Sequence, residues 1–396
     1  MSPSISITQT RDSSAIAELG APRRPLSGKG SFYRPELDML RFFAFLGVFF
    51  FHFYHPAEFY TEHGVPRLVA TVADSVMYAG VFGVDLFFVL SAYLITELLL
   101  REKEQCGALD VRGFYLRRML RIWPLYFFYI ALALIPAFNP NHVFTWRYAV
   151  AFLFLAGNWS IVAYGWPLHS IIGALWTVSI EEQFYLSWPP LVRKLSRKGI
   201  ALAAIAMLII SAATRIAMVA VHGGINSVWC NTLARLDPIA AGILVAVTLR
   251  GKIPNIRLSA RLALMCCGIL PLVFVANHWQ INAPDRLEWI PTLLGFPAVA
   301  VSCTLILFAV LGIAGRQARS LLYLGKISYG LYVYHELANF LSGKLIPVHA
   351  GFIQLALRPI LAMAFTIALA SISYAVLEKP FLKLKTRFAH ISSRPV

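Results

Sequence analysis

The sequence predicts an all-α, polytopic membrane protein with about ten transmembrane helices. Of its 396 residues, 58% are hydrophobic and only 14% are charged, whereas a soluble domain has about 25% charged residues. The mean hydropathy is +0.67, and the apolar residues form blocks long enough for a helix to cross a bilayer. Basic residues gather in short clusters between these blocks, which is typical of cytoplasmic loops.

The strong positive charge does not indicate a nucleic-acid partner. A net charge of +16 could favour nucleic-acid binding, but the basic clusters alternate with apolar blocks, as the positive-inside rule predicts. The five cysteines form no C-x-x-C pair. We interpret them as small core residues, so the sequence predicts neither a metal site nor a disulfide framework.

The chain divides into two short tails and one membrane domain. Residues 1–33 lack an apolar block and are predicted to be a disordered cytoplasmic tail without a signal peptide. Residues 34–385 are expected to form the transmembrane domain, and 386–396 a second cytoplasmic tail. The predicted spans lie near 37–56, 78–100, 122–137, 172–192, 199–221, 229–249, 259–276, 292–313, 327–346 and 353–377.

A further apolar segment, 147–164, conflicts with this topology if it crosses the membrane. The basic cluster at 193–198 would then face outward. A re-entrant segment near 147–164 instead places 27 of the 35 basic residues on the cytoplasmic side and four in external loops. We therefore predict both termini in the cytoplasm.

The first predicted span carries a polar stripe on one helix face. Arg41 and His52 are 11 residues apart, close to three helical turns, so they lie roughly 16 Å apart along the axis. Asp38 lies one turn before Arg41. Ionisable groups inside a span usually mark a pathway or reaction centre: His52 can take a proton, and Arg41 can hold an anionic oxygen. The structural alternative is that Arg41 reaches the interface and His52 satisfies a carbonyl.

Three arginines lie at the cytoplasmic end of the third predicted span. Arg118 and Arg121 are three residues apart and share a helix face, with Arg117 beside them. Paired guanidinium groups match phosphate oxygens, and an acyl donor such as acyl-coenzyme A supplies phosphates. The alternative is a positive-inside cluster that contacts lipid headgroups.

Other ionisable residues also fall inside predicted spans. Glu181 and Glu182 point about 100° apart, so we expect only one to face a polar interior, as a proton-transfer group or as the partner of a core arginine. The rest are Asp85, Arg235, Asp237, His335 and Glu336. We interpret a lone His335 as a satisfied core residue. No Walker loop, G-x-S-x-G elbow or zinc spacing is present.

Several motifs, in order, resemble the signatures of the membrane acyltransferase-3 family of bacterial integral-membrane O-acyltransferases. They are YRPELDMLR with its following His52, GVDLFFVLSAYLIT, FYLRRMLRIWPLY, LWTVSIEEQFYLSWPPL, RLDPIAAG, ISYGLYVYH and LEKPF. The resemblance covers nearly the whole chain. Two departures are Ser91-Ala92-Tyr93 for S-G-F and Asp38-Met39-Leu40-Arg41 for D-G-L-R; both lose a glycine and so bear on acceptor specificity.

The resemblance implies an enzyme of the bacterial inner membrane. It would transfer an acetyl or other short acyl group from cytoplasmic acyl-coenzyme A, a donor substrate and not a permanently bound cofactor, to a hydroxyl of a glycan, glycolipid or glycosylated small molecule. It makes His52 the essential catalytic residue, Arg41 its paired arginine, and Arg118 and Arg121 the residues on the donor side.

The complete set of candidates is therefore His52, Arg41, Asp38 and Glu181 for catalysis, and Arg118, Arg121 and Arg117 for the donor, with no metal ligand. His52 would act as a general base or as a transient acyl carrier. A transporter or flippase for a glycolipid or small anion would also need intramembrane charges, and an inactive lipid-binding scaffold is a third reading. Hydrolysis of acyl-coenzyme A by the purified protein would distinguish the enzyme from both.

Overall fold

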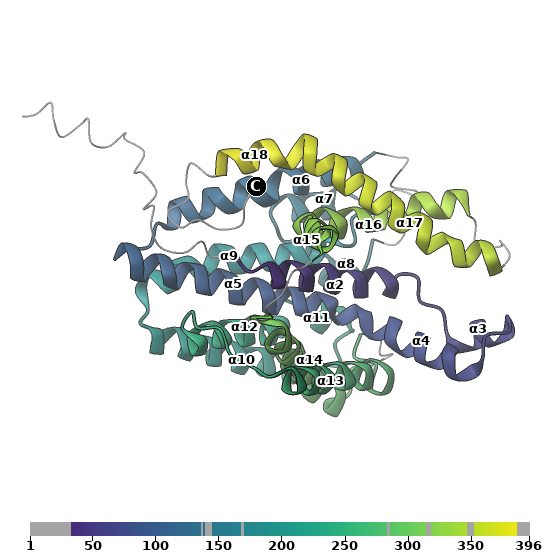
Figure 1. Cartoon of the computed structure of the whole chain (residues 1–396), viewed down its shortest axis with the longest axis horizontal. Helices are drawn as coiled ribbons and strands as arrows, with labels where there is room; N and C mark the ends of the chain where they lie inside the picture. Colours follow the sequence, from purple (N-terminus) through teal and green to yellow (C-terminus); the bar gives the residue numbers. More distant parts are fainter. Residues whose placement is uncertain are drawn as a thin grey trace, which may run out of the picture.

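A computed structural model describes residues 33–135, 138, 145–167, 170–282, 286–313, 318–346 and 352–385. Within these residues all regular structure is helical (Figure 1), so the predicted all-α class is confirmed for the part of the chain that is described. The predicted tails, 1–33 and 386–396, lie outside the described residues except for Tyr33, and so do most residues between the predicted third span and the segment 147–164.

The longer helices and the short segments between them follow in chain order. The helices are α2 (Pro35–Phe51), α3 (Ala57–Glu62), α4 (Arg67–Ala79), α5 (Gly83–Cys106), α6 (Val111–Ala133), α7 (Trp146–Leu153), α8 (Gly157–Tyr164), α9 (Leu175–Lys194), α10 (Arg197–Ala220), α11 (Asn226–Trp229), α12 (Leu236–Leu249), α13 (Leu258–Phe274), α14 (Trp289–Val310), α15 (Arg319–Lys326), α16 (Ser328–Leu345), α17 (Phe352–Ser373) and α18 (Lys379–Lys385). The short segments are the 3₁₀ turns η1 (Gly80–Phe82) and η4 (Leu233–Arg235) and the π-helical segments η5 (Val275–Trp279) and η6 (Tyr374–Glu378).

Five helices of the described residues are long and apolar enough to cross a membrane. They are Arg67–Cys106, Arg197–Ala220, Leu258–Trp279, Trp289–Val310 and Ala356–Leu384. The remaining predicted spans are short or polar: α2 has 17 residues and α12 has 14, while α6, α9 and α16 carry the ionisable side chains described below. The chain is thus a membrane protein, and the total of about ten spans stays a prediction.

The segment 147–164 is not one continuous helix. It consists of α7 and α8, each of eight residues and therefore about 12 Å long, too short to cross a bilayer. The break lies at Leu155, whose φ is 58°. The re-entrant path predicted for this segment is compatible with two short helices and stays a prediction.

Two other predicted elements differ from the structure. The predicted external loop after the first span contains α3 and α4, and α4 continues through η1 into α5. The predicted span at 229–249 is interrupted before α12, because the Asn158 amide donates to the Cys230 carbonyl and to Thr232 Oγ1, each at 2.9 Å. These bonds replace helical hydrogen bonds and hold the chain in a turn.

Helix α2 lies in the middle of the molecule and packs against α5, α15 and α16. Figure 1 shows it between a group with α17 and α18 on one side and a group with α10, α12, α13 and α14 on the other. Glycines allow this close packing: a Cβ on Gly80 would lie 2.2 Å from the Gly47 carbonyl oxygen, and one on Gly83 would lie 2.2 Å from that of Ala44. Backbone contact at these glycines fixes the position of the α2 side chains.

Two buried ion pairs account for other intramembrane charges that the sequence singled out. Arg235 Nη2 lies 2.9 Å from Asp85 Oδ2, and its guanidinium packs on the Trp229 ring at 4.4 Å. Arg215 Nη2 lies 3.0 Å from Asp237 Oδ1. Removing one partner of such a pair would leave an uncompensated buried charge, so we assign these residues to the scaffold.

Candidate functional site

Two cavities lie beside α2, and His52 and Arg41 line different ones. The first, the histidine cavity, has a volume of about 390 Å³ and is lined by His52, His335 and Glu336. The second, the arginine cavity, measures about 90 Å³ and is lined by Arg41, Arg118, Arg121 and Glu181. Val84 and Tyr332 line both cavities. The two cavities are therefore neighbours that share part of their lining.

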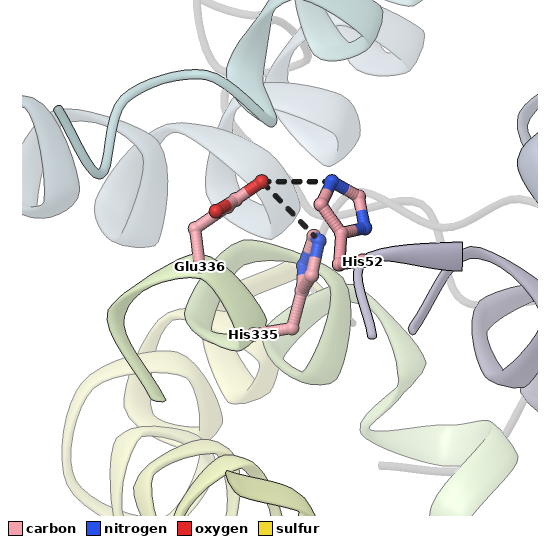
Figure 2. Close-up of side chains that lie close together, drawn as sticks. All are labelled: His52, His335 and Glu336. Carbon is pink, nitrogen blue, oxygen red and sulfur yellow. Dashed lines mark ion pairs between the residues drawn. The ribbon is translucent and has the colours of Figure 1, made fainter. Parts of the chain in front are cut away.

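His52 follows the last residue of α2 and faces Glu336. Its Nδ1 lies 2.8 Å from the Val48 carbonyl oxygen, and since a carbonyl only accepts, Nδ1 carries a proton and donates it. Its Nε2 lies 2.9 Å from Glu336 Oε1 (Figure 2). The His52 side chain is 29% exposed and that of Glu336 is 22% exposed. Nε2 is thus the nitrogen through which His52 can exchange a proton with a substrate in the cavity.

His335 completes the cluster from the neighbouring position on α16. Its Nδ1 lies 2.5 Å from the Tyr332 carbonyl oxygen, so this nitrogen also carries a proton. Its Nε2 is buried, lies 3.8 Å from Glu336 Oε1 and has no hydrogen-bond partner among the described residues. The imidazole rings of His52 and His335 are 4.8 Å apart between centroids, and Figure 2 shows both facing the same carboxylate.

This cluster also has the composition of a metal site. Ligand-type atoms of His52, His335 and Glu336 all lie within 4.8 Å of one another, and two imidazoles with a carboxylate can coordinate a divalent ion. The sequence predicted no metal ligand, because the three residues have no metal-binding spacing and come from opposite ends of the chain. The absence of a metal from the catalytic chemistry stays a prediction.

The arginine cavity collects positive charge around a single carboxylate. Arg118 and Arg121 come from α6, and neither forms an ion pair with an acidic side chain of the described residues. Arg41 is positioned by Asp38, whose Oδ1 lies 2.8 Å from Arg41 Nη1. Glu181 Oε1 accepts a hydrogen bond from Ser91 Oγ at 2.6 Å. Guanidinium groups that retain free donors can bind the oxygens of a phosphate.

Two aromatic rings pack against the guanidinium of Arg118. The Arg118 guanidinium carbon lies 5.5 Å from the ring centroids of both Phe114 and Tyr185. Such cation–π contacts stabilise the charge without using the N–H donors. The N–H groups of Arg118 thus stay available to a ligand.

Two predicted residues lie outside the lining of the arginine cavity. Arg117 is buried, and its Nη2 lies 2.9 Å from Glu102 Oε2. Glu182 faces Trp123, whose Nε1 donates to its Oε2 at 3.0 Å. The angular argument for the two adjacent glutamates therefore identified the arrangement correctly, since only Glu181 lines the cavity.

The structure brings the predicted residues together in a different grouping. Arg41 and Glu181 lie with Arg118 and Arg121, while His52 lies apart from them. Asp38 does not line the arginine cavity, but it forms an ion pair with Arg41, which does. The partner of His52, Glu336, was missed as a site residue. The signal that could have found it is the adjacent ionisable pair His335 and Glu336 within an apolar block.

Comparisons with known proteins identify the family of this chain. A family model described as an acyltransferase domain matches residues 34–375. The O-acetyltransferase OatA of Staphylococcus aureus strain NCTC 8325 / PS 47 is 26% identical over 398 residues, which cover 94% of this chain and 60% of the relative. "Putative O-acetyltransferase SAS0844" of Staphylococcus aureus strain MSSA476 is 26% identical over 385 residues, covering 89% and 58%. The chain thus spans about three fifths of the length of the curated relatives it matches. No solved structure matches the chain.

Proposed function

Because the chain belongs to the acyltransferase-3 family, whose domain model covers residues 34–375, we propose that it transfers an acetyl or other short acyl group from acyl-coenzyme A to a hydroxyl. The acceptor would be a glycan, a glycolipid or a glycosylated small molecule. One observation carries the proposal: a cavity with three arginines shares the lining residues Val84 and Tyr332 with a second cavity, in which His52 faces Glu336.

The arginine cavity is suited to the donor. Coenzyme A carries several phosphate charges, and Arg118, Arg121 and Arg41 offer guanidinium groups on one wall. Bidentate guanidinium–phosphate bonds supply both affinity and orientation. The cavity is small, so we propose that it receives part of the nucleotide or the adjoining arm of the donor, while the remainder lies at the cavity mouth.

The reactive end of the donor must reach the histidine cavity. Arg41 and His52 are roughly 16 Å apart along α2, a separation that the flexible pantetheine arm of coenzyme A can cover. The arm would pass Tyr332, whose hydroxyl accepts a hydrogen bond from Thr177 Oγ1 at 2.9 Å. The thioester would then lie beside His52 while the phosphates stay with the arginines.

The His52–Glu336 pair supplies the proton chemistry of the transfer. The step starts from neutral His52, with the acceptor hydroxyl in the place of Glu336 at the unprotonated Nε2. The acceptor oxygen attacks the thioester carbonyl carbon, its proton passes to His52 Nε2, and the carbon–sulfur bond breaks. His52 then returns the proton to the sulfur, so that an ester and coenzyme A thiol are the products. The Glu336 carboxylate, 2.9 Å from Nε2, stabilises the positive charge that develops on the imidazole.

The orientation follows from the distribution of basic residues. Because the predicted topology places 27 of the 35 basic residues on one side, we propose that the arginine cavity opens towards the cytoplasm, where acyl-coenzyme A is made, and that His52 lies nearer the external face. In a bacterium this membrane would be the inner membrane, with both termini in the cytoplasm.

A transporter or flippase is the second candidate, since neighbouring cavities inside the membrane would also serve a translocated solute. The two functions make opposite predictions for the purified full-length protein in liposomes supplied with acetyl-coenzyme A. An acyltransferase releases coenzyme A thiol, detected with a thiol reagent, at a rate that rises when a hydroxyl acceptor such as glucose is added. A protein that releases no thiol with or without acceptor, yet exchanges labelled sugar across the liposome membrane, would be a transporter.

A further inference from the structure

A third cavity also has His52 in its lining. This aromatic pocket has a volume of about 300 Å³, and its lining includes His52, Phe53, Tyr54, Phe59, Tyr60 and Arg358. Since His52 also lines the histidine cavity, a molecule in the aromatic pocket would reach the catalytic imidazole without passing the arginine cavity. The donor and a second substrate could therefore approach His52 from different directions.

The pocket wall is built from rings at the turn between α2 and α3. The His55 and Phe59 rings stack at 4.5 Å between centroids, and the Phe59 and Tyr60 rings meet edge to face at 5.5 Å. An aromatic face carries partial negative charge, and the C–H groups on one face of a sugar ring complement it. The lining thus has the chemistry that holds a saccharide.

Arg358 gives the pocket a positive charge, and we find no acidic partner for it among the described residues. Its Nη2 donates to the neutral Asn339 Oδ1 at 2.9 Å, and its guanidinium carbon lies 5.9 Å from the Phe53 ring centroid. The Nε atom is buried and has no hydrogen-bond partner among the described residues. No acidic side chain of these residues forms an ion pair with Arg358. A guanidinium in an apolar helix without a counter-ion is costly, and an anionic ligand would remove that cost.

The guanidinium is held in place by the same helix that carries Glu336. Asn339 lies one turn after Glu336 on α16. A Cβ on Gly343, one further turn along, would lie 2.9 Å from Arg358 Nη2, so the glycine leaves the space that the guanidinium fills. The spacing between Arg358 and the His52–Glu336 pair is therefore fixed by one rigid helix.

We propose that the aromatic pocket is the acceptor subsite and that it selects an acceptor with an anionic group. The phosphate or carboxylate binds Arg358, the sugar ring packs against the aromatic wall, and a hydroxyl reaches His52 Nε2. This inference rests on the proposed function, and it narrows the substrate class to acidic or phosphorylated saccharides. Both kinds present the same oxyanion chemistry to the guanidinium.

The test measures binding and turnover separately. The full-length protein in phosphatidylcholine nanodiscs is titrated with glucose, glucuronate and glucose 1-phosphate, and each sugar is then offered with acetyl-coenzyme A. We expect the two anionic sugars to bind at least tenfold more tightly than glucose. Arg358→Gln should lose about tenfold to a hundredfold in affinity for them and little for glucose. The exposed arginine of α4 gives the matched control, Arg67→Gln, which should bind and turn over like the unmodified protein.

Two further variants keep the test decisive if Arg358→Gln fails to fold. Arg358→Lys keeps the charge and should restore part of the preference for anionic sugars. Gly343→Ala keeps Arg358 but displaces its guanidinium, and should weaken the binding of glucuronate and glucose 1-phosphate but not of glucose. The proposal is overturned if the unmodified protein binds glucose as tightly as glucuronate, or if none of the three variants changes the preference.

The remaining outcomes separate this proposal from its alternatives. We expect the affinity for glucuronate to be the same in nanodiscs that contain phosphatidylglycerol. If this lipid instead competes with glucuronate in the unmodified protein and not in Arg358→Gln, Arg358 binds a lipid headgroup and the proposal fails. If the anionic sugars bind through Arg358 but no acetyl-coenzyme A is consumed with any sugar, the subsite stands and the proposed function fails.

Discussion

At the scale of single residues, His52 forms hydrogen bonds with two groups that have different roles, the Val48 carbonyl and the Glu336 carboxylate. The Val48 carbonyl fixes the tautomer by accepting from Nδ1, and Glu336 lies against the nitrogen that exchanges the proton. This differs from a serine-protease triad, in which the carboxylate binds the Nδ1 side. Here the carboxylate and the substrate hydroxyl approach the same nitrogen, Nε2. Glu336 must therefore make room at Nε2 when the acceptor binds.

Glu336→Gln tests this assignment. Glutamine keeps the size and the hydrogen-bonding capacity of the side chain but cannot balance an imidazolium. We expect acyl transfer to fall about 10²- to 10⁴-fold, measured as acetylated product per unit time at saturating acetyl-coenzyme A. The exposed acid Glu288 provides a control, since Glu288→Gln removes the same charge from a residue that lines neither the histidine cavity nor the arginine cavity. Full activity in Glu336→Gln would make the carboxylate a structural group.

Tyr332 should act as the divider between the two substrate cavities. It lines both of them and is buried, so a larger ring at this position would narrow the passage. We expect Tyr332→Trp to reduce acyl transfer at least tenfold while the Kd for acetyl-coenzyme A changes little, because the arginines are untouched. Tyr332→Phe removes only the hydrogen bond from Thr177 and should cost less. Equal rates for both variants and the unmodified protein would show that the acyl group takes another path.

At the scale of elements, helix α6 carries arginines with two different environments: two line the arginine cavity and one forms an ion pair between helices. Arg118 and Arg121 share a face that lines the arginine cavity, while Arg117, about 100° round the helix from Arg118, pairs with Glu102 from α5. The first two are available to a ligand, whereas the third is part of the packing between helices. Residues adjacent in sequence thus have separate functions because of the helical repeat.

The contrast gives a matched pair of variants. The double variant Arg118→Ala and Arg121→Ala should raise the Kd for acetyl-coenzyme A about tenfold to a hundredfold without changing thermal stability. Arg117→Ala should leave the Kd for acetyl-coenzyme A unchanged. It should instead destabilise the fold by about 3–5 kcal/mol, because buried Glu102 loses its ion-pair partner. Calorimetric titration and thermal unfolding separate the two effects. Unchanged donor affinity in the double variant would assign these residues to lipid headgroups.

The sequence predicted contacts within one helix better than contacts between helices. Asp38 and Arg41 are one turn apart, so helical geometry alone placed them together, and the structure confirms the contact at 2.8 Å. The partner of His52 is 284 positions later in the chain, and no periodicity relates two helices so distant. The interruption before α12 was missed for the same reason, since the amide that holds it comes from Asn158 on α8.

At the scale of the whole molecule, the polar helices line the two cavities, and the most apolar helices contribute few buried residues. The helices that supply the two cavities include α2, α6, α9 and α16, which are short or polar for membrane spans. Highly apolar helices such as α10 and α13 contribute few buried residues and would face lipid. Surrounding polar helices with apolar ones keeps costly charges away from hydrocarbon.

The topology can be tested with fusions at two points. A reporter placed after Lys198 should read as cytoplasmic, and one placed after Asn141 as external, because the basic cluster at 193–198 is expected to stay inside. The measurement is the activity ratio of a reporter pair, such as alkaline phosphatase and a fluorescent protein, that work on opposite sides. An external reading at Lys198 would mean that the chain crosses the membrane fully at 147–164.

The most direct test of the account replaces the catalytic imidazole in the full-length protein. His52→Gln keeps a side chain of similar size that can still hydrogen-bond, but it cannot take a proton at neutral pH. The control is His63→Gln, because the exposed His63 makes the same type of contact, with Nδ1 2.7 Å from the carbonyl oxygen four residues earlier. Acyl transfer from acetyl-coenzyme A is measured in liposomes with equal amounts of inserted protein. The account predicts a loss of about 10²- to 10⁴-fold for His52→Gln and none for His63→Gln. An inserted His52→Gln protein that transfers acyl groups at the unmodified rate would contradict it.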